Sequence, residues 1–219
     1  MGIYSRHIFP WLMNRAMSGD NFTNIRRSLL ADVQGMTLEI GFGTGLNLPH
    51  YPSSIERITT VDVNPGMGPL AGKQAEQSPI QVDWRVLDSE SLPMDDETFD
   101  SVVSTWTLCS IPNVQGAIGE IYRVLKPDGR FFFVEHGLSN EPDVQKWQRR
   151  LNPVQKIIGD GCHLTRDIAA LIRLGGFRFV ELERMYMDKV PRIGGYLYRG
   201  IAARSPATGG SVAKEPSNS

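Results

Sequence analysis

The feature that most constrains the fold is the segment LEIGFGTGLNLP, residues 38–49, where three glycines fall within five positions directly after a strand-like run. A strand that enters a glycine-rich turn is typical of nucleotide-binding α/β folds, because glycine lets the backbone approach a ligand and adopt a positive φ. Gly41, Gly43 and Gly45 have the spacing G-x-G-x-G, whereas dinucleotide sites have G-x-G-x-x-G. Glu39 places a carboxylate beside the loop, which would repel a pyrophosphate and suits a ligand that carries positive charge.

Seven segments have the composition of strands. They are residues 37–41, 57–62, 82–87, 100–105, 129–135, 177–185 and 195–203. Alternation of strands and helices with short connections implies parallel strands and right-handed crossovers. The last two strands are joined by a loop with Pro191 and Gly194, which suits an antiparallel hairpin. We therefore expect an α/β fold, namely a Rossmann-like, doubly wound, seven-stranded and mostly parallel sheet with an antiparallel last strand.

Helical periodicity is present between and around these strands. It predicts helices over residues 114–126, 144–158 and 166–174, the last capped by Thr165. Residues 3–31 also have helical spacing, and Pro10 starts or kinks a helix there.

The composition is that of one ordinary globular domain. The chain has 219 residues, of which 41% are hydrophobic and 21% charged, so it can form a single α/β core. A formal net charge of −1 gives no electrostatic footprint for nucleic acid. Cys109 and Cys162 are too few for a disulfide framework or a metal site, so we expect no metal and a reducing, cytoplasmic setting. No apolar run approaches the roughly 20 residues that cross a bilayer.

Carboxylates follow the second and third predicted strands. Asp62 can accept hydrogen bonds from two ribose hydroxyls, and Asp88 can accept one from an adenine amino group. Their alternative roles are a helix N-cap for Asp62, which Asn64 can perform instead, and a surface turn for Asp88. Carboxyl ends of parallel strands form the ligand edge of such sheets. A cationic adenosyl ligand without phosphate fits this edge, and S-adenosylmethionine is such a ligand.

Five segments in order resemble the sequential motifs of class I S-adenosylmethionine-dependent methyltransferases. They are EIGFGTG, VDVNP, DSESLP, FDSVVST and RVLKPDGRF, within residues 37–136. Three further segments, TWTLCSIPN, FFFVEHG and DGCHLTR, look like the membrane-associated alkyl thiol methyltransferases and their bacterial relatives. The narrower resemblance extends to about residue 180.

The resemblance implies a set of cofactor residues. Backbone carbonyls near Thr105 and Trp106 would hold the methionyl ammonium, and Met67 would pack on the adenine, although core packing is an alternative for Trp106 and Met67. The complete predicted cofactor set is Glu39, Gly41, Gly43, Gly45, Asp62, Val63, Asn64, Met67, Asp88, Ser89, Thr105 and Trp106.

Candidates for acceptor chemistry are fewer. His136 at the end of the fifth strand is predicted as a catalytic base, with a structural role as the alternative. Cys109 is either a nucleophile or, more simply, a small buried residue. Asp160 and His163 belong to a loop over the substrate side or serve capping and turn formation.

The predicted function is methyl transfer to a small molecule, with a thiol or another soft nucleophile as the preferred acceptor. O-, N- or C-methylation of a phenolic, quinone, amine or lipid headgroup substrate is the alternative. Two readings from other classes are a nicotinamide-dependent oxidoreductase, against which the glycine spacing speaks, and a cofactor-binding regulator without catalysis.

These patterns divide the chain into three parts. Residues 1–36 form an N-terminal helical lid, residues 37–204 a class I methyltransferase domain, and residues 205–219 a disordered tail. The aromatic, amphipathic N-terminal segment packs over the active site or, alternatively, makes peripheral contact with a membrane surface. The expected partners are a small-molecule methyl acceptor and no nucleic acid, and the sequence predicts no oligomeric state.

Overall fold

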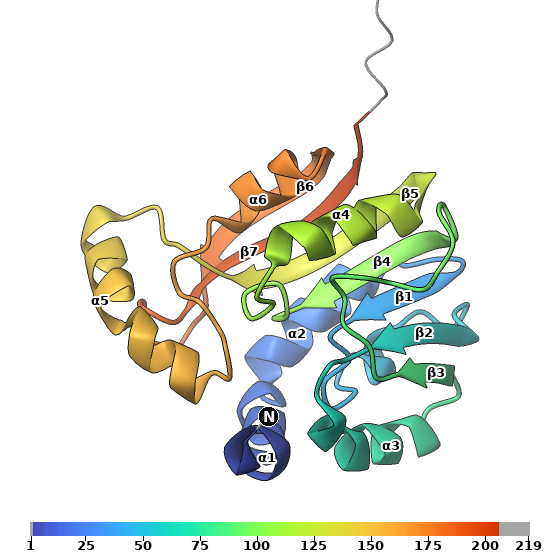
Figure 1. The fold of residues 1–219 in the computed structure, drawn as a ribbon, viewed down its shortest axis with the longest axis horizontal. Coiled ribbons are helices and arrows are strands. Elements are labelled where there is room, and N and C mark those ends of the chain that lie inside the picture. The colour runs from blue at the N-terminus through green and yellow to red at the C-terminus, as the bar shows by residue number, and fades with distance from the viewer. Residues whose placement is uncertain (1, 206–219) are drawn as a thin grey trace, which may run out of the picture.

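A single seven-stranded sheet organises the protein (Figure 1). The structure is a computed structural model and describes residues 2–205, so all but Ser205 of the predicted tail lies outside the described residues. The strand order is β3-β2-β1-β4-β5-β7-β6. Strands β3, β2, β1, β4 and β5 run parallel, and β7 is antiparallel to both β5 and β6. The predicted Rossmann-like sheet with an antiparallel last strand is confirmed.

The strands lie where the sequence predicts them, with small shifts at their ends. Their bounds are β1 Thr37–Ile40, β2 Arg57–Val61, β3 Gln81–Arg85, β4 Phe99–Thr105, β5 Leu125–His136, β6 Phe177–Tyr186 and β7 Tyr196–Arg204. The largest difference is at β5, which starts four residues before the predicted Gly129. It does so because Leu125 already pairs with Phe99 of β4, ahead of a register shift.

The predicted helices are also present. Their bounds are η1 Tyr4–Ile8, α1 Phe9–Met17, α2 Asp20–Leu30, η2 Leu48–His50, η3 Pro65–Met67, α3 Gly68–Glu76, α4 Val114–Val124, α5 Pro142–Ile158 and α6 Ile168–Leu174. The prediction that Thr165 caps α6 is wrong. Asp167 is the cap, and its side chain accepts a hydrogen bond of 3.0 Å from the Ala170 amide.

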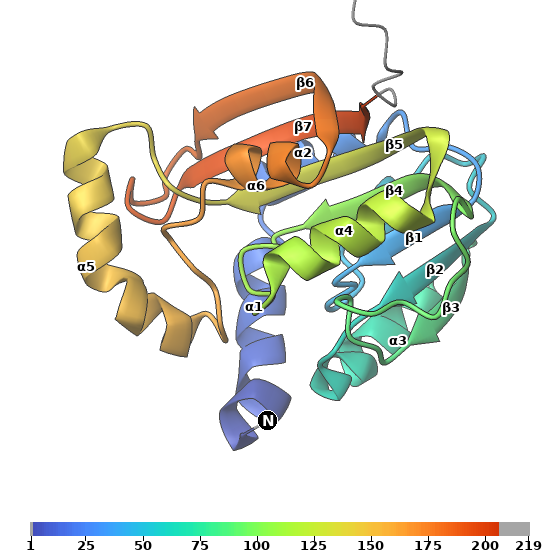
Figure 2. The same cartoon turned by 45° about the horizontal axis from the view of Figure 1, so that its top comes forward.

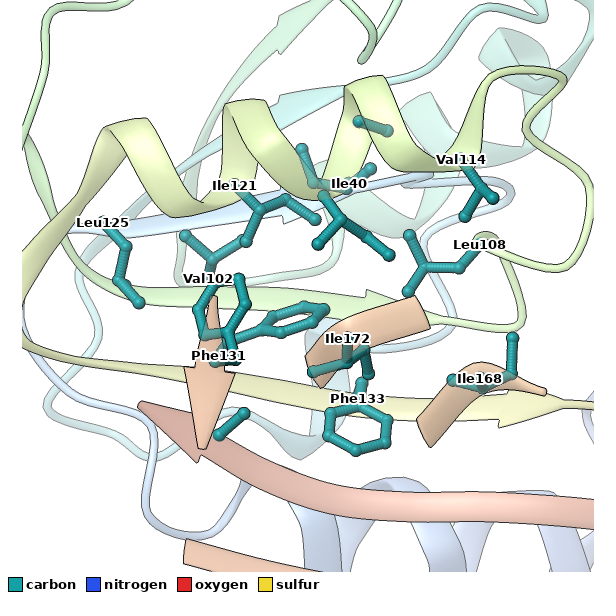
Figure 3. Packing of buried hydrophobic residues seen from close by; sticks show 14 of the residues in the cluster. Ile40, Val102, Leu108, Val114, Ile121, Leu125, Phe131, Phe133, Ile168 and Ile172 are labelled. Carbon is teal, nitrogen blue, oxygen red and sulfur yellow. The ribbon is translucent and has the colours of Figure 1, made fainter. Parts of the chain in front are cut away.

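Two apolar layers cover the two faces of the sheet. Phe131 and Phe133 of β5 face α4 and α6 in one layer (Figure 3). Phe132 and Val134 face the opposite side and share the second layer with Leu30 of α2. Figure 2 shows α4 and α6 on the near face of the sheet and α2 behind it. Because both faces are buried at β5, Phe131–Val134 reads as a continuous apolar run, as central strands of parallel sheets do.

The carboxyl ends of the parallel strands point toward the side where α1 and α5 lie (Figures 1 and 2). The strand order reverses between β1 and β4, and open α/β sheets bind ligands at the carboxyl ends beside such a reversal. Among the described residues, no helix combines the length and the apolar character that spanning a membrane requires.

Candidate functional site

A cavity of about 310 Å³ opens at this edge of the sheet, within the size range of small-molecule sites. Its walls come from the glycine loop, the ends of β2, β3 and β4, the N-terminal helix α1 and the loop after α5. Ten residues predicted to bind the cofactor line it: Gly41, Gly43, Asp62, Val63, Asn64, Met67, Asp88, Ser89, Thr105 and Trp106. The structure therefore brings residues from four separate segments to one site.

The glycine loop presents bare backbone to this cavity. Gly43 has φ +56°, and a Cβ added there would find only the Gly41 carbonyl oxygen, 4.0 Å away. Gly41 has φ +73°, and a Cβ there would collide with the Thr107 side chain. Gly41 is thus required by packing, whereas Gly43 leaves free space that a ligand can occupy.

Asp62 holds the loop in place with both carboxylate oxygens. One oxygen accepts from the Gly43 amide at 2.7 Å, and the other accepts from the Asn64 amide at 2.8 Å. The pKa of Asp62 is raised by burial, an effect these two bonds oppose. Asn64 caps η3 by accepting from the Gly66 amide at 2.9 Å, as predicted, so Asp62 is not needed as a cap.

Asp88 and Ser89 line the cavity from the segment after β3. Asp88 is exposed and Ser89 is buried. One Asp88 oxygen accepts from the Glu90 amide at 2.9 Å. Asp88 therefore closes a turn, the alternative role considered from the sequence, and it also lines the cavity.

Trp106 lies in the cavity wall in a left-handed conformation, with φ +51°. The guanidinium of Arg26 stacks over its ring at 4.9 Å, and Phe22 packs against the ring edge at 5.2 Å. Arg26 is only 3% exposed and donates to the Met17 carbonyl at 2.7 Å. Burial lowers the pKa of Arg26 to about 10. Arg26 is a site residue that could not be predicted, because the sequence of an amphipathic helix does not indicate that the guanidinium of one of its arginines turns inward.

The N-terminal segment closes one side of the cavity. Phe9, Met13 and Met17 of α1 line it. The hydroxyl of Ser5 donates to Asp160 at 2.6 Å, and the carbonyl of Ser5 accepts from the Asn64 side chain at 2.9 Å. Within the predicted lid, α1 lines the cavity and η1 is hydrogen-bonded to two lining residues through Ser5. Helix α2 packs on the sheet and adds Arg26 to the lining.

Glu39 and Gly45, also predicted to bind the cofactor, are not among the lining residues. The Glu39 carboxylate is 1% exposed and accepts from the Asn47 side chain at 2.8 Å and from the Tyr51 hydroxyl at 2.6 Å. Burial raises the pKa of Glu39 to about 7, against the lowering effect of these two bonds. Glu39 thus binds the segment that follows the glycine loop, through Asn47 and Tyr51, and does not line the cavity.

His136, the predicted catalytic base, also lies outside the cavity lining. Its ring is 6% exposed, and Nδ1 lies 3.3 Å from Cys162 Sγ. Cys162 Sγ lies in turn 3.4 Å from Cys109 Sγ. Cys109 is 2% exposed and is not a lining residue. Its thiol is therefore not placed to act as a nucleophile in the cavity. The spacing of these three residues along the chain does not indicate that they meet.

Comparisons with known proteins agree with this geometry. Residues 38–133 match the family model described as a methyltransferase domain. Rat thiol S-methyltransferase TMT1B is 36% identical over 191 residues, which cover 80% of this chain and 77% of that protein. Human thiol S-methyltransferase TMT1B is 33% identical over 192 residues, covering 80% and 78%. This chain is a class I S-adenosylmethionine-dependent methyltransferase.

Solved structures support the fold of the methyltransferase. An S-adenosylmethionine-dependent methyltransferase from Thermotoga maritima has a TM-score of 0.64 at 20% identity, covering 92% of this chain and 97% of that one. The [4+2]-cyclase SpnF has a TM-score of 0.65 at 20% identity, covering 84% and 80%. Because these two proteins are named for different activities, the fold by itself does not fix the reaction.

The lining of the methyltransferase fits S-adenosylmethionine better than a phosphorylated nucleotide. The Gly43 amide, which could face a phosphate, already donates to Asp62. The one cationic side chain among the described lining residues is Arg26, which is occupied by Trp106 and the Met17 carbonyl. Three carboxylates line the cavity, Asp62, Asp88 and Asp160. They disfavour an anion, and Asp62 and Asp88 suit the hydroxyls and amino group of an uncharged nucleoside.

Proposed function

We propose that this methyltransferase methylates the sulfur of a small apolar thiol. The observation that carries the proposal is an apolar part of the cavity lining that is not in the predicted cofactor set. We call it the apolar wall, and its residues are Phe9, Met13, Met17, Leu46 and Ile111. That wall offers dispersion contacts to an alkyl group and no fixed charge to an ionic acceptor.

The ionisable groups around the cavity also favour a thiol. Among the described lining residues there is no Lys, His, Tyr or Cys, and Asp160 is the carboxylate in the loop after α5. A thiol has a pKa of about 8.5, and its thiolate is the nucleophile. A weak base is therefore sufficient for a thiol, whereas a phenol with a pKa of about 10 needs more help.

In this proposal Asp160 is the base that accepts the thiol proton, in place of His136, the base predicted from the sequence. His136 faces Cys162 from a buried position, whereas Asp160 lines the cavity. The Asp160 carboxylate would receive the thiol proton directly or through one water, and its bond from Ser5 would fix its orientation.

The remaining residues bind, orient and exclude water. Bound S-adenosylmethionine would supply a methyl group on a sulfonium. The acceptor sulfur would bond to the methyl carbon in line with the breaking carbon–sulfur bond, and S-adenosylhomocysteine would leave. Asp62 would hold the ribose hydroxyls, Asp88 and Ser89 the adenine side, and the backbone at Thr105 and Trp106 the methionyl ammonium. Phe9 and Met13 would keep water from the thiolate, which makes it more reactive.

The names of the relatives support the same acceptor class. The rat and human proteins at 36% and 33% identity are both named thiol S-methyltransferases. Other matches have names with different acceptors, including a phosphatidylethanolamine N-methyltransferase from Cereibacter sphaeroides at 27% identity. The acceptor therefore has to be tested directly.

The test is a panel of acceptors with methyl-labelled S-adenosylmethionine. Small alkyl thiols and sulfide should give labelled thioethers or methanethiol, while matched alcohols, phenols and amines should give little product. The variant Asp160→Asn should lower turnover with thiols while the affinity for S-adenosylhomocysteine stays nearly constant. Label found only in phenols or amines would refute the thiol assignment.

Peripheral membrane contact also belongs to this proposal. Ile3, Ile8 and Trp11 are exposed in the N-terminal segment, and Ile157 and Ile158 are exposed at the end of α5. The Tyr4 hydroxyl donates to the Ile158 carbonyl at 2.6 Å, so the two apolar groups lie close together. Sedimentation with anionic vesicles should bring down wild-type protein and much less Trp11→Glu; equal sedimentation of both would contradict this contact.

A further inference from the structure

Three soft ligand side chains meet outside the cavity. They are Cys109 in the loop after β4, His136 at the end of β5 and Cys162 in the loop between α5 and α6. One ligand atom from each residue lies within 4.8 Å of the other two. All three side chains are buried, and no disulfide joins the cysteines.

The histidine in this group is not explained by ordinary core structure. A buried imidazole usually satisfies both ring nitrogens, one often on a carbonyl or carboxylate. Here Nδ1 faces Cys162 Sγ at 3.3 Å, and Nε2 has no hydrogen-bond partner among the described residues. The polar contact of the ring is therefore with a thiol.

The backbone around the two cysteines is held in place without the thiols. The Cys109 amide donates to the buried Glu135 carboxylate at 3.2 Å, and the Cys109 carbonyl accepts from the His163 amide at 2.9 Å. The Cys162 amide donates to the Gly159 carbonyl at 3.1 Å. The sulfur atoms are thus positioned by their backbones. Their side-chain contacts include each other, His136 Nδ1 and, for Cys109, the Ser110 hydroxyl at 3.7 Å.

We propose that Cys109, His136 and Cys162 bind one thiophilic metal ion, Zn(II) or Cu(I), through two sulfurs and one imidazole nitrogen. Thiolate and imidazole are the ligands these ions prefer. The spread of the three ligand atoms, within 4.8 Å, is compatible with bonds of about 2.0–2.3 Å to a common ion after small side-chain rotations.

The proposed metal ligands lie next to residues that line the cavity. Ser110 follows Cys109 directly and Asp160 precedes Cys162 by two positions, and both Ser110 and Asp160 line the cavity. An ion bound by Cys109 and Cys162 would cross-link the loop after β4 to the loop after α5. The metal would then stabilise the wall while remaining outside the site of methyl transfer.

The experiment is metal titration of the reduced, full-length chain after treatment with a chelator. One arm uses Zn(II) and the other uses Cu(I), with elemental analysis after gel filtration. We expect about one ion per chain in at least one arm. At about 100-fold excess over Kd, the melting temperature should rise by roughly 5–10 °C.

Variants separate this site from adventitious binding. His136→Ala and Cys162→Ser should lose the ion, with folding checked by circular dichroism. His163→Ala is the matched control, since His163 is adjacent to Cys162 and outside the cluster, and it should bind as the wild type does. Co(II) should give thiolate charge-transfer absorption that Cys109→Ser reduces without full loss of folding.

Several outcomes would overturn the proposal. They are the absence of stoichiometric binding by the reduced chain, retention of the ion in both His136→Ala and Cys162→Ser, and Co(II) spectra without sulfur ligation. If the reduced chain binds no ion and mild peroxide links the two cysteines, the cluster is a redox-active thiol pair and the metal assignment is wrong.

Discussion

Replacement of Gly43 by alanine tests the central feature of the cofactor site. A Cβ at Gly43 would project into open space, with its nearest neighbour 4.0 Å away. The folded protein without ligand can therefore accommodate the methyl group. The cost to folding comes from the backbone, because alanine at a φ of +56° loses about 1–2 kcal/mol. For a domain of this size the melting temperature should fall by roughly 2–8 °C.

The loss in cofactor affinity should be larger than this folding cost suggests. The added methyl group occupies the space that the bare backbone leaves in the cavity, so S-adenosylhomocysteine has to move away from Asp62. Each hydrogen bond to that carboxylate is worth about 1.5–3 kcal/mol, so weakening the two bonds without breaking both corresponds to about 2–3 kcal/mol. The dissociation constant should therefore rise about 30- to 150-fold.

Gly45→Ala provides a matched control for Gly43→Ala. Gly45 also has a positive φ, +80°, but it does not line the cavity, and its Cβ would meet Gln74 at 3.1 Å. Gly45→Ala should lose comparable or greater stability and retain most of its affinity for S-adenosylhomocysteine in isothermal titration calorimetry. Equal affinities for wild type and Gly43→Ala, or equal losses in both variants, would refute the assignment of the cavity.

Three further predictions concern other parts of the site. Asp62→Ala should weaken S-adenosylhomocysteine binding by about 1–3 kcal/mol in calorimetry, since it removes a charged acceptor; unchanged binding would contradict the ribose role. Because burial raises the pKa of Glu39 to about 7, the folded state holds this proton more tightly than the unfolded state. Stability from this group is thus lost as pH rises from about 4.5 to about 7, on the order of 1–3 kcal/mol. Urea titrations should show a shallower pH dependence for Glu39→Gln, and identical slopes would rule out this linkage. Ser5→Ala should lower kcat for the thiol about two- to tenfold, because the Ser5 hydroxyl, 2.6 Å from the Asp160 carboxylate, orients the proposed proton acceptor; an unchanged kcat would separate Ser5 from the acceptor side.

The residues at strand ends could be predicted from the sequence because a topological rule fixes their position. Asp62 and Asp88 follow parallel strands, and the carboxyl ends of such strands share one edge. Asn64 was predictable as a cap because Pro65 follows it. These inferences depend on local order along the chain and on a general rule of α/β folds, and neither requires knowledge of side-chain packing.

The inward or outward direction of individual side chains could not be predicted in the same way. All four residues of β1 are buried, so no polar alternation shows which face Glu39 occupies. Cys109 and Cys162 meet only because the connection between α5 and α6 returns to the loop after β4. The path of that connection is set by tertiary contacts, which single-sequence patterns do not contain.

Ser5 joins the donor and acceptor sides of the enzyme. Its carbonyl is bonded to Asn64 on one side and its hydroxyl to Asp160 on the other. An outward displacement of η1 would break both hydrogen bonds together, so we expect S-adenosylhomocysteine and the methylated product to leave after the same movement. The rate of that movement would then limit turnover. A substitution that strengthens the two bonds of Ser5 would slow product release even where it speeds the chemical step.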